Sequence, residues 1–152
     1  MPELITEQLI ALEVDLGSKR DVIEAIADLL AAGDRLEDRD GYVADVLARE
    51  DVFETGIGDE IAIPHARSAA ASESSLVYLR LCAPVDWGES GPARFIFGIA
   101  VPAANADDSH LKILASVARK LLDPAIRAVV QRSASRREIL DALRPRPEED
   151  RP

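Results

Sequence analysis

Two histidines, His65 and His110, are the only imidazole groups in the chain. His65 follows the run Ile61-Ala62-Ile63-Pro64, so it is expected at the exit of a short strand, where the proline restricts the backbone just before it. Neutral imidazole is abundant near pH 7, and its unprotonated ring nitrogen is a nucleophile. His65 is therefore a candidate for nucleophilic chemistry.

The neighbours of His65 indicate which chemistry this would be. Arg49 ends the preceding predicted helix, and Arg67 lies two residues beyond the histidine. Gly56 and Gly58 allow the backbone to present N–H groups to an anion. Phosphoryl transfer requires positioning and charge stabilisation more than covalent machinery. The pattern favours phosphoryl chemistry at His65, although a lone histidine at a strand end is more often a structural residue.

His110 occupies the first turn of a predicted helix that starts at Ser109. The free N–H groups of a helix start attract anions, and a ring nitrogen there could donate to one. The other reading of this position is a ring that covers apolar surface. Neither histidine has a second Cys or His at ligand spacing, so no metal site is expected.

Other reaction classes lack their signatures in this sequence. There is no G-x-S-x-G elbow, and the glycines between Thr55 and Gly58 spell neither a Walker nor a dinucleotide motif. No cofactor is therefore expected.

The elements that must position these residues follow from periodicity, caps and breaks. Helices are predicted over 18–33, 38–50, 109–122, from Pro124, and 135–143, with Gly33 as the residue that follows the end of the first helix. Strands are predicted over 61–63, 76–82 and 94–101, with Thr55 to Gly58 as a turn. The last two strands are almost continuously apolar, as in central strands covered on both faces, and Cys82 is expected to be buried there. Helices interspersed with strands indicate an α/β layered domain.

Length, charge and cysteine count limit the function further. The chain has 152 residues, of which 47% are hydrophobic, enough for a single domain over 1–144 with a flexible acidic, proline-containing tail over 145–152. A formal charge of -10 argues against nucleic-acid binding. One cysteine and no signal-peptide pattern favour a cytoplasmic protein that begins at its own first methionine. No apolar stretch approaches the roughly 18 residues of a membrane span, so no membrane insertion is expected.

Two blocks of sequence resemble a known family. The segment from Arg49 to Arg67, with Thr55-Gly56-Ile57-Gly58 and Ile61-Ala62-Ile63-Pro64-His65, is similar to the active-site signature of EIIA domains of the fructose/mannitol class. These domains belong to the bacterial phosphoenolpyruvate-dependent sugar phosphotransferase system. Ser109-His110-Leu111-Lys112-Ile113-Leu114-Ala115 looks like the helix that carries the second active-site histidine of the family. The similarity runs from Leu4 to Leu143.

The resemblance implies a mixed β-sheet flanked by helices on both sides, and a phosphocarrier function. It makes His65 the residue that accepts a phosphoryl group from phospho-HPr and passes it to a cysteine of an EIIB domain. It makes His110 a neighbour that orients the ring or the phosphate, with Arg49 and Thr55 near the phosphate. Val85-Asp86-Trp87-Gly88 and Gly91-Pro92 look like the fructose-type members.

The sequence departs from the family's pattern at two positions, and two alternatives to the phosphocarrier function stay open. Glu54 stands where a small serine is frequent in the family, and Glu60 stands where glycine is frequent. A carboxylate close to a phosphoryl group opposes its charge unless it points away. The chain could instead be a nitrogen-type regulatory EIIA whose phosphorylation controls partner binding, or a member that folds but no longer carries phosphate. Sequence alone predicts no oligomeric state.

Overall fold

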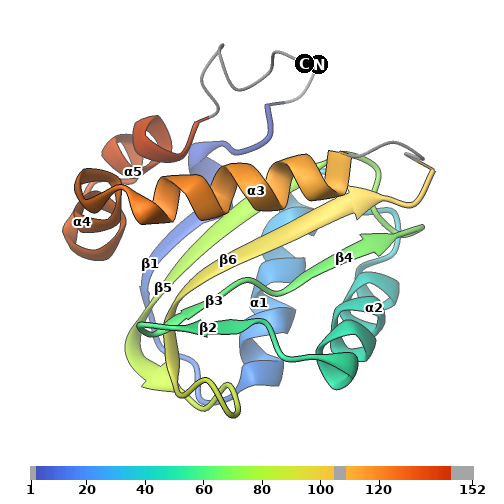
Figure 1. Cartoon of the computed structure of the whole chain (residues 1–152). Helices are drawn as coiled ribbons and strands as arrows, with labels where there is room; N and C mark the ends of the chain where they lie inside the picture. The colour runs from blue at the N-terminus through green and yellow to red at the C-terminus, as the bar shows by residue number, and fades with distance from the viewer. Residues whose placement is uncertain (1–2, 105–108, 145–152) are drawn as a thin grey trace.

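A six-stranded mixed β-sheet forms the centre of the computed structural model, which describes residues 3–104 and 109–144, with the backbone alone for residues 109–111 (Figure 1). The predicted tail, 145–152, lies outside the described residues. The strands are β1 (Ile10–Val14), β2 (Gly56–Gly58), β3 (Ile61–Ala62), β4 (His65–Ser68), β5 (Ser75–Val85) and β6 (Ala93–Pro102). Their order in the sheet is β1-β5-β6-β3-β2, and β4 also pairs with β6.

The pairing directions make the sheet mixed. β5 pairs antiparallel with β6, whereas β1 pairs parallel with β5. Both β3 and β4 run parallel to β6, and β2 returns antiparallel beside β3. β3 and β4 thus lie one after the other along the same edge of β6, with Pro64 between them.

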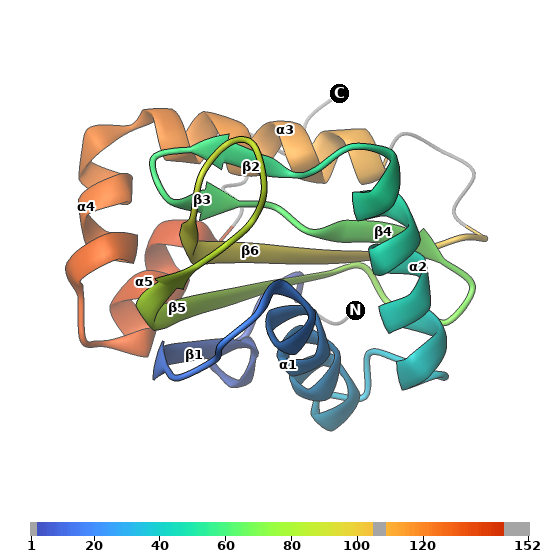
Figure 2. The same cartoon turned by 90° about the horizontal axis from the view of Figure 1, so that it is seen from below.

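Helices cover both faces of this sheet. Helices α1 (Lys19–Ala32) and α2 (Arg39–Val52) lie on one face, and α3 (Ser109–Leu122) crosses the other, as the two views show (Figures 1 and 2). Helices α4 (Pro124–Arg132) and α5 (Arg136–Leu143) follow α3, and α5 packs near β1. The predicted α/β fold with a mixed sheet between helices is confirmed. Over residues 3–104 and 109–144, no helix combines the length and the apolar character that crossing a bilayer requires.

Side-chain caps fix where the helices begin. Ser18 Oγ accepts from the Asp21 N–H at 3.1 Å, Asp38 Oδ1 accepts from the Gly41 N–H at 3.1 Å, and Ser135 Oγ accepts from the Glu138 N–H at 3.1 Å. Each bond satisfies one of the N–H groups that a helix start leaves without an intrahelical partner. These starts agree with the ones predicted from the sequence.

The buried centre of the sheet is formed by β5 and β6, as predicted from their apolar runs. The prediction for Cys82 was wrong, because its side chain is exposed. β5 continues three residues beyond Cys82, and its pairing with β6 is irregular between Arg80 and Val85. Residues 82–84 are exposed in this irregular stretch.

Two turns differ from the predictions. The residue with left-handed backbone after α1 is Asp34 (φ 59°), and Gly33 has an ordinary φ of -90°. Within the predicted turn at Thr55 to Gly58, residues Gly56–Gly58 instead form strand β2, and the chain reverses one step later, at Asp59 and Glu60. Both of these residues have positive φ, 56° and 63°. The sequence did not mark this turn, because glycine is the usual signal of a left-handed turn residue and neither Asp59 nor Glu60 is a glycine.

Candidate functional site

His65 is the first residue of β4 and is 6% exposed. Its strand pairs with the central strand β6, where His65 lies opposite Ile99. The backbone next to it is also held by the sheet, because the Ile99 N–H donates to the Pro64 carbonyl at 3.0 Å. The ring is thus attached to a strand of the central sheet and not to a loop.

One ring nitrogen of His65 has a defined partner. Nδ1 lies 2.7 Å from the carbonyl oxygen of Ile63. A carbonyl oxygen only accepts, so Nδ1 carries the proton and, in the neutral ring, Nε2 carries the lone pair. This hydrogen bond selects the tautomer in which Nε2 is the nucleophile.

Burial lowers the pKa of His65 below its ordinary value of 6.5. The bond to the Ile63 carbonyl opposes this shift, the positive charge of Arg49 adds to it, and the negative charge of Glu50 opposes it. Since the net direction is downward, the ring is neutral at pH 7. A neutral ring with its lone pair on Nε2 is the form that attacks phosphorus.

Arg49 lies in the last turn of α2 and is half-buried. Its Nη1 donates to the Phe53 carbonyl at 2.8 Å, which holds the guanidinium at the helix end. No carboxylate of the described residues forms an ion pair with it. The positive charge of Arg49 contributes to the lowered pKa of His65. This arrangement suits an anion bound between the two side chains.

Thr55 supplies a buried hydroxyl without a partner. The residue is 7% exposed, and its Oγ1 makes no hydrogen bond to any described residue. Its N–H donates to Glu50 Oε1 at 3.3 Å. A buried hydroxyl without a partner is costly unless a ligand completes it, so Thr55 Oγ1 is a candidate donor to a phosphate.

The other predicted site residues lie on strands β2 and β4. Gly56 and Gly58 belong to β2, and a Cβ at Gly56 would stand 3.3 Å from Trp87 Cδ1. Arg67 is two residues after His65 on β4 and therefore on the same face of the strand; its Nη2 donates to the Ala103 carbonyl at 3.3 Å. The structure thus brings Arg49, Thr55, His65 and the strand of Arg67 to one region.

His110 lies in the first turn of α3, as predicted. Its side chain is outside the described residues, so its role at the site stays a prediction.

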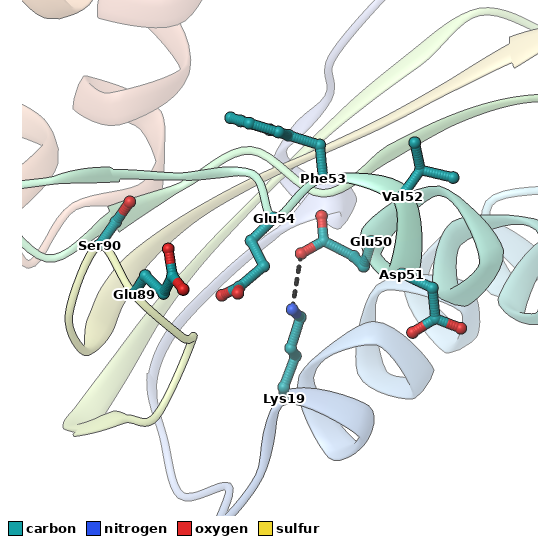
Figure 3. A pocket seen from close by; sticks show the side chains of 8 residues that line it. All are labelled: Lys19, Glu50, Asp51, Val52, Phe53, Glu54, Glu89 and Ser90. Carbon is teal, nitrogen blue, oxygen red and sulfur yellow. Dashed lines mark ion pairs between the residues drawn. The ribbon is translucent and has the colours of Figure 1, made fainter.

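A pocket of about 450 Å³ opens between the end of α2, the start of α1 and the loop before β6 (Figure 3). It is lined by Lys19, Glu50, Asp51, Val52, Phe53, Glu54, Glu89 and Ser90. Two of these residues, Val52 and Phe53, are large apolar side chains that are 82% and 73% exposed. The Glu54 carboxylate lies against Gly88, where a Cβ would come within 1.1 Å of Oε2.

Lys19 and Glu50 were not predicted as residues of this region, and Trp87 was named only in the segment that resembles the fructose-type members. Glu50 is 4% exposed, and its Oε1 pairs with Lys19 Nζ at 2.9 Å and accepts from Trp87 Nε1 at 3.0 Å. An acidic residue in the last turn of a helix is ordinarily solvated, and nothing in its spacing marked it as buried. The usable signal was Trp87, the single tryptophan of the chain, because a buried indole N–H requires an acceptor.

Among residues 3–104 and 109–144, no group of His, Cys, Asp and Glu side chains is arranged to hold a metal ion. The chemistry that the described residues support is carried by the imidazole, the guanidinium, the hydroxyl and the backbone.

Known proteins are similar to this chain in both sequence and fold. A fructose-specific EIIA component from Haloferax volcanii is 34% identical over 138 residues, which cover 90% of this chain and 89% of that protein. Multiphosphoryl transfer protein 2 of Escherichia coli is 35% identical over 140 residues, 92% of this chain but 17% of that much longer protein. The crystal structure of the nitrogen regulatory protein IIA-Ntr from Neisseria meningitidis superposes with a TM-score of 0.78 at 28% identity, covering 92% of this chain and 96% of that one.

The family model for EIIA 2 of the phosphoenolpyruvate-dependent sugar phosphotransferase system matches residues 3–145, almost the whole chain. With the relatives above, this match shows that the chain belongs to the EIIA 2 family of the sugar phosphotransferase system.

Proposed function

We propose that the chain is a phosphocarrier that accepts a phosphoryl group on Nε2 of His65 from phospho-HPr and passes it to a cysteine of an EIIB domain or protein. The observation that carries the proposal is the 2.7 Å contact from His65 Nδ1 to the Ile63 carbonyl, which leaves the lone pair on Nε2. The absence of a carboxylate partner for Arg49 among the described residues, and the unbonded Thr55 hydroxyl, add two donors for the phosphate.

The transfer follows from these groups. The Nε2 lone pair attacks phosphorus, and the bond from phosphorus to the donor breaks, with its electron pair returning to the donor. The Nδ1 proton stays on the ring and keeps its bond to the Ile63 carbonyl. In the second step a cysteine thiolate attacks the phosphorus, the P–N bond breaks, and Nε2 regains its lone pair. Charge stabilisation falls to Arg49, and positioning to Thr55 and the backbone of β2.

Arg67 and His110 complete the proposed site. Arg67 adds positive charge on the strand of His65, and His110 orients the ring or the phosphate from the first turn of α3. The Glu54 carboxylate lines the pocket and lies against Gly88, an arrangement that supports retention of phosphate transfer in spite of the acidic residue.

The sugar we propose is fructose, with the protein in the cytoplasm. The named specificity of the Haloferax relative supports this choice. The second candidate function is that of a nitrogen-type regulator, in which the phosphorylation state of His65 decides which partner is bound. The likeness to the Neisseria structure, at 28% identity, favours keeping it.

Labelling tests the phosphocarrier function. Incubation with phosphoenolpyruvate, Enzyme I and HPr is expected to produce an acid-labile, alkali-stable phosphohistidine on the wild type. His65→Ala is expected to abolish the label, and His110→Ala to slow its appearance. Lack of label on the wild type, under conditions that charge a control EIIA, would contradict the proposal.

Transfer onward separates the two candidates. Delivery of the label to a fructose EIIB, with sugar phosphate as the product, supports the transport function. Failure of that transfer, together with capture of a kinase or a potassium-transporter component that depends on the phosphorylation state, supports the regulatory function.

A further inference from the structure

A chain of hydrogen bonds runs from a buried carboxylate to the His65 ring. Glu50 Oε1 accepts from the Thr55 N–H at 3.3 Å, and the Thr55 carbonyl accepts from the Ile63 N–H at 3.1 Å. The Ile63 carbonyl in turn accepts from His65 Nδ1 at 2.7 Å. All four residues are less than 9% exposed, so water does not compete for these bonds.

The carboxylate at the start of this chain is fixed from two further sides. Lys19 Nζ, at the first turn of α1, lies 2.9 Å from Glu50 Oε1 (Figure 3). Trp87 Nε1 donates to the same oxygen at 3.0 Å, and Lys19 Nζ also stands 5.2 Å from the centre of the Trp87 ring. Three separate parts of the fold therefore converge on one oxygen.

Packing makes the same segment stiff. The Trp87 ring lies against Gly56, directly after Thr55, where an added Cβ would stand only 3.3 Å from Trp87 Cδ1. Thr55 is thus held through its N–H by Glu50, through its carbonyl by Ile63, and through its neighbour by Trp87. A displacement of Glu50 would be passed to the carbonyl that holds the His65 ring.

We propose that Glu50 is a positioning residue for the His65 ring: through Thr55 and Ile63 it holds the carbonyl that keeps the proton on Nδ1 and the lone pair on Nε2. Glu50 does not touch the phosphate in this role. The inference deepens the proposed function and rests on it, since ring geometry matters for transfer only if His65 is the acceptor. A misplacement of a reacting group by about 1 Å can cost about 100-fold in rate.

The test compares three substitutions at Glu50. Glu50→Gln keeps an acceptor for Thr55 and Trp87, whereas Glu50→Met has similar volume without an acceptor, and Glu50→Ala removes both. Long-range ¹H–¹⁵N NMR spectra of the His65 ring report the tautomer without any phosphorylation. We expect the wild type and Glu50→Gln to show Nδ1–H, and Glu50→Met and Glu50→Ala to show a mixture with Nε2–H. Phosphoryl acceptance should fall about 100-fold in Glu50→Ala and recover in Glu50→Gln.

Asp51→Ala is the matched control, because Asp51 is the next residue, lines the same pocket and is exposed. Its removal should leave the tautomer unchanged. A wild-type tautomer in Glu50→Met or Glu50→Ala would overturn the proposal, and so would an equal shift in Asp51→Ala. If both of these Glu50 variants fail to fold, hydrogen exchange of the Thr55 and Ile63 amide protons in the wild type tests the proposal instead. Strong protection from exchange supports the series of hydrogen bonds from Glu50 to His65, and rapid exchange overturns it.

The two proposals fail in different ways. A correct tautomer response with no phosphorylation of the wild type would reject the phosphocarrier function and retain the role of Glu50 in ring geometry. Phosphorylation of the wild type with no tautomer response would reject the role of Glu50 alone.

Discussion

At His65, burial and hydrogen bonding act on the same ring in opposite directions. Burial lowers the pKa of the ring, and the bond from Nδ1 to the Ile63 carbonyl raises it. The first effect keeps the ring neutral, and the second chooses which nitrogen holds the lone pair. A phosphoryl acceptor needs both, because a charged ring or the other tautomer leaves no nucleophile at Nε2.

The charge of Arg49 should affect both the pKa of His65 and the rate of phosphoryl acceptance. Arg49→Ala should raise the pKa of His65, since the guanidinium charge lowers it, and a ¹⁵N titration of the ring would measure the change. Phosphoryl acceptance should fall by about 10²–10³-fold, the usual cost of losing one group that stabilises the transferred charge. Arg49→Lys should restore the pKa but only part of the rate, because an ammonium lacks the two-pronged geometry of guanidinium. An unchanged rate in Arg49→Ala would rule out its role at the phosphate.

The lowered pKa of His65 also predicts how stability depends on pH. The unfolded chain binds a proton on this histidine below about pH 6.5, whereas the folded chain binds it only at a lower pH. The contribution of His65 is therefore fully present above pH 6.5 and is lost as the pH falls toward the folded-state pKa. Urea unfolding of the wild type and His65→Gln from pH 8 to pH 5 measures it: the wild type should lose more stability below pH 6.5 than the variant. Parallel curves would contradict the prediction.

Among the elements, the hairpin between β2 and β3 carries backbone strain. Its two reversing residues, Asp59 and Glu60, both have left-handed backbone, which favours glycine. The Glu60 carbonyl also accepts from the N–H groups of Arg94 and Phe95, at 2.8 and 2.9 Å, so the turn is tied to the start of β6. The family's frequent glycine at position 60 thus has a conformational explanation.

Replacing Glu60 should consequently stabilise the protein. Glu60→Gly is expected to raise the free energy of unfolding by about 1 kcal/mol, the cost of left-handed backbone for a residue with a Cβ. Glu60→Ala removes the same charge but keeps the Cβ, so it should gain little. Urea unfolding of both variants separates the two causes. Equal gains in the two variants would assign the effect to charge and not to the backbone.

How far the sequence predicts these elements depends on the kind of signal. Ser18, Asp38 and Ser135 mark their helix starts by local chemistry, and the structure bears them out. The strand order depends on long-range pairing that no local pattern contains. β4 is missed because four residues with a histidine, an arginine and a serine do not look like a strand; pairing with β6 makes them one.

The candidate site divides in the same way. One contiguous motif contains Arg49, Thr55 and His65, so the sequence predicts all three as site residues together. Glu50 and Trp87 are 37 positions apart, and only the packing of α2 against the loop after β5 brings them together. Their roles depend on burial, and the burial of a charged residue at a helix end cannot be predicted from its sequence position.

On the scale of the whole molecule, buried polar contacts attach the C-terminal helices to the sheet. Arg80 of β5 is 3% exposed, and its guanidinium donates to the carbonyls of Val130 and Ser133 at the end of α4. The Tyr78 hydroxyl donates to the Val130 carbonyl as well. The carbonyls at a helix end lack intrahelical partners, so a buried arginine is suited to satisfy them. These contacts add to the burial of the apolar side chains that the two short helices place in the core: Ile126, Val130, Ile139, Leu140 and Leu143.

Removing this guanidinium should loosen the C-terminal helices before it affects the rest of the fold. Arg80→Met keeps the apolar stem but leaves the Ser133 carbonyl without its donor, an expected cost of about 1–3 kcal/mol. Glu13, the ion-pair partner of Arg80 at 3.0 Å, is 55% exposed, so Glu13→Gln should cost less than about 1 kcal/mol. Hydrogen exchange should then be faster in α4 and α5 of Arg80→Met, with α1 and α2 unchanged. Uniformly faster exchange over all helices would show that Arg80 supports the whole domain and does not act mainly as a local attachment. An equal loss of stability in Glu13→Gln would assign the stabilisation to the ion pair and not to the hydrogen bonds with the carbonyls.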